Sequence, residues 1–170
     1  QVRMPTFKLT DEEWNAIIRS FQYHDNQPLA FESDFHVNTS TTKYRAGKKL
    51  EELGACNNCH FYGKEFPKQG AQTWAPNLAL TKERLQPKWV IDWMEDPQSI
   101  MPGTKMPAPF LPDKELLNTP GAVSDWGEHV VKVGGDRETM LEGLRDYIYS
   151  IKGKTDITNE IQQYFEKNGY

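Results

Sequence analysis

Apolar side chains recur at helical spacing in four stretches of the chain, two of which lie near its ends. Residues 11 to 22 follow Thr10-Asp11-Glu12-Glu13, a capping box that starts helices. The apolar positions of this stretch are Trp14, Ile17, Ile18 and Phe21. The tail from Asp156 repeats the spacing at Ile157, Ile161, Tyr164 and Phe165. Because the tail is short and not basic, we expect a helix docked on the domain rather than a membrane anchor.

The other two stretches predict a pair of packed helices. Residues 43 to 53 carry Tyr44, Leu50 and Leu53 on one side, and Gly54 is expected to end that helix. Residues 137 to 151 follow Asp136 as a cap, with an apolar stripe of Leu141, Leu144, Tyr147, Ile148 and Ile151. Gly47 costs the earlier helix up to about 1 kcal/mol relative to alanine. We therefore expect the late helix to pack closely against it.

These elements predict an all-α fold in three parts. Residues 1 to 37 form an N-terminal helical extension, 38 to 153 the main domain, and 154 to 170 a C-terminal helical tail. Residues 37 to 42 are polar and read as a linker that supplies the cap of the next helix.

Composition and charge restrict the partners of this chain. Its 170 residues, 37% hydrophobic and 26% charged, suit one compact domain with appendages. The formal charge of -4 argues against nucleic acid as a partner and leaves no basic tract for anionic lipid. No apolar run approaches the length that a membrane span requires. A protein partner with a basic patch suits the charge better.

The chemistry of the sequence is concentrated in Cys56-Asn57-Asn58-Cys59-His60, which holds both cysteines of the chain. Two cysteines at this spacing can each add to a haem vinyl group as a thioether, and the histidine that follows can bind the iron. A structural zinc site would need four ligands, and no second cysteine pair completes one. A thioredoxin-like dithiol would need alternating strands and helices around it. The motif therefore predicts one covalent haem c, with iron as the metal.

Three further segments follow this motif in a recognisable order. They are Ala75-Pro76-Asn77-Leu78, then Arg84 to Trp89 continuing through Trp93 to Asp96-Pro97, and then Pro102-Gly103-Thr104-Lys105-Met106. With them, the stretch from Tyr44 to Lys152 resembles a class I c-type cytochrome, a fold of a few helices wrapped around one covalent haem.

The resemblance implies that the carbonyl of Pro76 accepts the imidazole proton of His60. It also implies that Trp89 and Trp93 lie on a helix that walls the haem pocket, and that Gly47 meets Tyr147 where two helices cross.

The resemblance places the sixth iron ligand at Met106, within a loop that several prolines restrict. Met101 is the main rival, and His129 a weaker one.

Met94 and Met140 fall on helices, where a methionine usually fills gaps in a core. His24 and His36 lie in polar stretches, where a histidine is usually a solvated side chain. Trp74 is most simply part of the apolar wall, although an indole N–H in relatives can bond a propionate.

Residues 113 to 135 depart from the family pattern. Pro120-Gly121 and Gly134-Gly135 bracket Trp126 and a short apolar run there, so we expect an insertion with some order of its own.

The expected function is single-electron transfer by a haem with His60 and Met106 as iron ligands, and the domain itself is not expected to be an enzyme. The alternative is a haem enzyme or gas-binding sensor with a labile sixth ligand. Other redox proteins are the expected partners. Thioether attachment of haem takes place outside the bacterial cytoplasm or in organelles, so a periplasmic location or another one beyond the cytoplasmic membrane is expected.

The first residues suggest a longer parent protein. Arg3-Met4-Pro5 followed by the capping box resembles the axial methionine and final helix of another cytochrome c domain. The alternative is an ordinary capped helix. Because the chain starts at Gln1 rather than Met, we expect it to be the C-terminal haem domain of a larger redox protein, in which Met4 would serve another haem.

Overall fold

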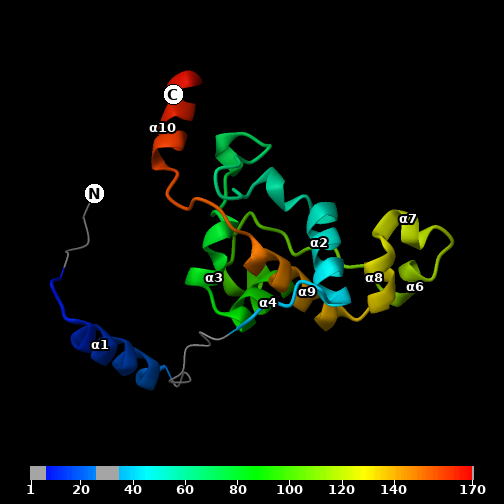
Figure 1. Ribbon diagram of the computed structural model, residues 1–170, viewed down its shortest axis with the longest axis horizontal. Coiled ribbons are helices and arrows are strands. Elements are labelled where there is room, and N and C mark those ends of the chain that lie inside the picture. Colours follow the sequence, from blue (N-terminus) through cyan, green and yellow to red (C-terminus); the bar gives the residue numbers. More distant parts are fainter. Residues whose placement is uncertain (1–6, 26–34, 170) are drawn as a thin grey trace. The chain divides into compact units, whose positions relative to one another are not determined.

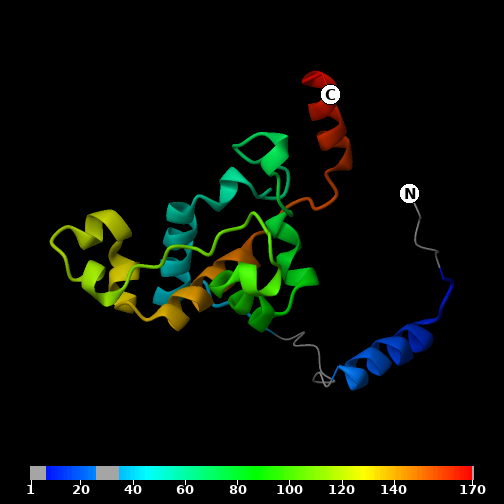
Figure 2. The same cartoon turned by 180° about the vertical axis from the view of Figure 1, so that it is seen from behind.

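The computed structural model describes residues 7–25 and 35–169, which are mostly helical (Figures 1 and 2). Extended pairing in this part of the chain is limited to two isolated bridges, between His60 and Ala75 and between Tyr62 and Glu65. The all-α prediction is therefore confirmed. The chain divides into two compact units, Gln1–Asp34 and Phe35–Tyr170, which are described separately.

The described part of the first unit is dominated by α1 (Asp11–His24). The predicted capping box is present, since the Glu13 amide donates to Thr10 Oγ1 at 3.3 Å and the Thr10 amide to Glu13 Oε2 at 2.8 Å. The helix buries none of its side chains. Met4, the candidate ligand of another haem, lies outside the described residues.

Two helices that cross closely form the centre of the second unit: α2 (Thr42–Gly54), capped by Thr41, and α9 (Arg137–Ser150), capped by Asp136. The predicted close approach at Gly47 is confirmed, because a Cβ on Gly47 would lie only 1.9 Å from the carbonyl oxygen of Gly143. The residue that Gly47 meets is thus Gly143, not the Tyr147 that the family resemblance implied. Tyr147 instead lies against Tyr44, with the ring centres 5.9 Å apart.

The chain between these two helices begins with a sharp turn. Helix α2 ends at Gly54, the residue expected to end it, and the next residue, Ala55, adopts the left-handed conformation (φ 50°). Short helices follow: η1 (Cys56–Asn58), η2 (Ala71–Thr73), η3 (Leu78–Leu80), α3 (Thr81–Arg84), α4 (Pro87–Glu95) and α5 (Pro97–Ile100). Pro87 opens α4, where its missing N–H costs no hydrogen bond.

The segment at 113–135 contains three short helices, α6 (Lys114–Leu117), α7 (Ala122–Trp126) and α8 (Glu128–Val133). The expectation of local order there is confirmed. Helix α8 packs on α2, and Val130 is completely buried in the shared core. Met94 and Met140 lie in this core as well, which confirms their predicted packing role.

The tail forms the predicted helix, α10 (Thr158–Lys167), and Tyr164 and Phe165 both contact Trp74 of the main domain. The tail is therefore docked, as expected. Within the ranges that the structure describes, no helix has the length and apolar character needed to cross a membrane.

Candidate functional site

The two cysteines lie on a tight turn directly after α2. Ala55 redirects the chain into η1, and the amides of Cys59 and His60 both donate to the carbonyl of Cys56, at 3.2 and 2.9 Å. Both thiols are free and half-buried. One turn of backbone therefore presents two thiols and an imidazole in close succession.

The imidazole of His60 is held by residues 75–78, one of the three segments that follow the cysteine motif in the sequence. Its Nδ1 lies 2.7 Å from the carbonyl oxygen of Pro76. A carbonyl only accepts hydrogen bonds, so the proton resides on Nδ1 and the lone pair on Nε2 is left for another partner. The amide of Ala75 fixes the loop by donating to the Cys59 carbonyl at 2.8 Å. Burial lowers the pKa of His60 and the bond to Pro76 opposes this, so the ring is neutral near pH 7.

The surroundings of Cys56 oppose the reading of the motif as a reactive dithiol. Burial raises the pKa of the Cys56 thiol to about 12, and the nearby carboxyl of Glu51 adds to the shift. A redox-active cysteine needs the opposite, a lowered pKa that supplies thiolate at neutral pH. In the described ranges, no three His, Cys, Asp or Glu side chains gather as a metal ion would require.

Met106 is held by one of the tryptophans predicted to wall the pocket. Trp93 Nε1 donates to the Met106 sulfur at 2.9 Å, and the rings of Trp89 and Trp93 stack 5.3 Å apart. A thioether sulfur has two lone pairs, so this bond leaves one for a metal. Met106 is half-buried against the core, whereas Met101 is 58% exposed. The loop that carries both methionines passes in front of α2 in Figure 2.

The predicted site residues therefore form two groups. His60 contacts Pro76 beside the cysteines, and Met106 contacts Trp93, which stacks on Trp89. In the described part of the chain, no hydrogen bond or ring contact joins one group directly to the other. His129 lies on α8 outside both groups, and His24 and His36 are exposed.

A buried carboxyl near Cys56 was missed by the sequence analysis. Glu51 is only 6% exposed, and the hydroxyl of Tyr62 donates to it. Burial raises the pKa of Glu51 above its ordinary value, and the bond from Tyr62 opposes this. The only signal in the sequence was the position of Glu51 beside the apolar Leu50 on α2, which does not by itself predict burial.

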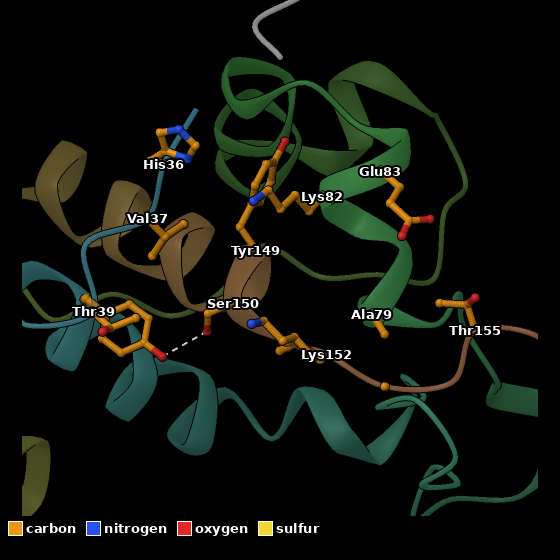
Figure 3. Close-up of a pocket in the computed structure, with 13 residues that line it drawn as sticks. His36, Val37, Thr39, Ala79, Lys82, Glu83, Tyr149, Ser150, Lys152 and Thr155 are labelled. Atoms are coloured by element: carbon orange, nitrogen blue, oxygen red, sulfur yellow. Dashed lines mark hydrogen bonds between the residues drawn. The ribbon is translucent and has the colours of Figure 1, made fainter. Parts of the chain in front are cut away.

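A cavity of about 570 Å³ lies apart from these residues (Figure 3). Its walls come from the start of the second unit, η3, α3 and the end of α9, with Tyr44 Oη and Ser150 Oγ hydrogen bonded at 2.9 Å. Lys82, Glu83 and Lys152 give it charges of both signs. None of the residues predicted to bind haem lines this cavity.

The donor atoms of the two groups suit a covalently attached haem. They comprise two thiols for thioether bonds, one imidazole with a free Nε2, and one thioether sulfur. No family model, curated protein or solved structure matches this chain.

Proposed function

We propose that this chain is a class I cytochrome c domain that binds one haem c and transfers single electrons. Cys56 and Cys59 form the thioether bonds, and His60 and Met106 are the iron ligands. The observation that carries the proposal is the 2.7 Å contact between His60 Nδ1 and the Pro76 carbonyl, directly beside the two cysteines. That contact leaves Nε2 as the coordinating atom and increases its basicity.

The haem supplies the one-electron chemistry, and the residues of the chain control its environment. Pro76 fixes the orientation and tautomer of His60. Trp93 fixes the sulfur of Met106, and its stack with Trp89 provides an apolar surface beside that sulfur. A thioether ligand favours the ferrous state, which raises the reduction potential.

The contacts that fix Met106 favour an electron carrier over a haem enzyme or gas sensor. An enzyme or sensor requires an open or labile sixth position, whereas the Met106 sulfur is bonded to an indole and packed against the core. We propose other redox proteins as partners, with basic surfaces that complement the net charge of -4. The location that follows from thioether attachment is the periplasm or another compartment beyond the cytoplasmic membrane.

Covalent attachment is the property to test first. The chain should be produced in a host that attaches haem c, and then extracted with acidified acetone. We expect the colour to stay with the protein and the mass to exceed that of the polypeptide by one haem. A variant with both Cys56→Ser and Cys59→Ser serves as the control and should release any colour. Complete extraction of haem from the unmodified protein would refute the proposal.

A further inference from the structure

The C-terminal helix α10 contacts the loop region around His60 through a cluster of aromatic rings. Tyr164 stacks on Phe66 with ring centres 5.4 Å apart and lies 4.9 Å from Trp74. Phe165 lies 5.5 Å from Trp74 on the same helix. Phe66 and Trp74 both contact the buried ring of Phe61, which directly follows His60 in the chain. Figure 1 shows α10 beside this loop region.

Trp74 connects this cluster to the residue that orients His60. It precedes Ala75 and Pro76, and its Nε1 donates to the Gln69 carbonyl at 3.2 Å. The Gln69 amide in turn donates to the carbonyl of Asn58, inside the cysteine motif, at 3.0 Å. The loops at 57–60, 66–70 and 74–76 are therefore linked to one another, and the rings of α10 cover Phe66 and Trp74.

We propose that α10 acts as a clamp on this loop region, and that Tyr164 and Phe165 are positioning residues that keep the Pro76 carbonyl on His60. The proposal rests on the haem function proposed above. Both residues act on His60 through Trp74, whose ring they contact. Removing one of these rings uncovers part of the loop that carries Pro76. The loop then moves more, so the Pro76 carbonyl spends more time away from Nδ1 of His60. A weaker hydrogen bond makes the imidazole a poorer electron donor to iron, which destabilises the ferric state.

The test compares Tyr164→Ala with two matched controls in the haem-loaded protein. Tyr164→Phe keeps the ring, and Gln163→Ala changes the exposed neighbouring residue on the same helix. For Tyr164→Ala we expect a more positive reduction potential and exchange of the Ala75 and Leu78 amide protons faster by about tenfold. These amides are informative because they donate to the carbonyls of Cys59 and Phe61. Both controls should match the unmodified protein in both measurements.

The outcomes separate the clamp from the haem function. An unchanged potential in Tyr164→Ala, in protein that carries covalent haem, would overturn the clamp while leaving the proposed function intact. Unmodified protein without covalent haem would instead overturn the proposed function. If Tyr164→Ala does not fold, Phe165→Ala takes its place. Phe165→Ala keeps the stack of Tyr164 on Phe66 but removes the contact of Phe165 with Trp74. It should therefore shift the potential in the same direction.

Discussion

The indole of Trp93 distinguishes between two methionines that lie five positions apart in one loop. A thioether is a weak ligand, so the methionine that coordinates iron is the one whose sulfur is presented with little ordering left to do. Trp93 donates to Met106, while Met101 is largely exposed. This contact supports Met106 as the sixth ligand by a physical argument that is independent of family resemblance.

Substitution of each methionine tests this assignment. In the haem-loaded protein, Met106→Ala should abolish the weak far-red sulfur-to-iron band and let the ferrous form bind carbon monoxide readily. Met101→Ala should retain the band and resist carbon monoxide, which makes it the matched control. The reverse pattern would assign the ligand to Met101, and retention of the band in both variants would exclude both residues.

The buried carboxyl of Glu51 should make the stability of the protein depend on pH. Burial raises its pKa in the folded state, so the folded protein binds this proton more tightly than the unfolded chain. The stability that the protonated Glu51 contributes is fully present below the ordinary glutamate pKa of about 4.5. It is lost as pH rises through the pKa of Glu51 in the folded protein. The charged groups that act on Glu51 are Glu52, Lys48 and Lys68, and its hydrogen-bond partner is Tyr62.

We therefore expect Glu51→Gln to remove this dependence. The free energy of unfolding of the variant, relative to that of the unmodified protein, should increase as pH rises above 4.5. Denaturant titrations at several pH values between 4.5 and 8 measure this difference. Glu138→Gln is the control, because Glu138 is exposed and is not among the charged groups that act on Glu51. A constant difference between Glu51→Gln and the unmodified protein across this range would show that Glu51 titrates normally.

At the scale of elements, the crossing of α2 and α9 is the contact on which the second unit depends. The two helices approach so closely at Gly47 and Gly143 that neither position has room for a Cβ. The same crossing brings Lys43 to Glu142 at 2.7 Å and lets Tyr44 lie against Tyr147. The position of the cysteine turn, directly after α2, is therefore set by this helix pair.

Gly47→Ala should destabilise the protein even though alanine is the better helix former. The added methyl group would lie 1.9 Å from backbone that cannot give way without moving α9. Overpacking of this kind costs about 1–3 kcal/mol, which exceeds the gain of up to about 1 kcal/mol in helix propensity. Thermal unfolding measures the result.

Gly54→Ala on the same helix is the matched control for this prediction. A Cβ there would meet nothing closer than the Cys56 sulfur at 3.6 Å, an ordinary contact. The control should be neutral or slightly stabilising. A Gly47→Ala variant that is as stable as Gly54→Ala would contradict the close crossing.

For the whole molecule, the expectation is electron transfer without turnover of a small substrate. The loop around Met106 offers Lys105 and prolines but no carboxyl or imidazole that would act as a distal acid or base. The haem-loaded protein should be reduced rapidly by a small donor and reoxidised by a partner cytochrome, with slow or no turnover of peroxide, nitrite or nitric oxide. Turnover that greatly exceeds that of free haem would contradict this prediction, and Met106→Ala should show more of it than the unmodified protein.

The sequence by itself determined the helices and their caps, including α1, α2 and α9, and it singled out Cys56, Cys59 and His60 as the candidate site. These features depend on residues a few positions apart, where capping, periodicity and motif spacing act. The predicted partnership of Pro76 and His60 also agrees with the structure, because a short recognisable segment carries it.

The tertiary structure alone decided which distant segments meet. It selected Gly143 rather than Tyr147 as the partner of Gly47, joined Trp93 to Met106, buried Glu51, and set the rings of α10 on Phe66 and Trp74. Each of these contacts depends on how whole helices and loops fill shared space, and a local pattern of apolar and polar residues does not encode that geometry.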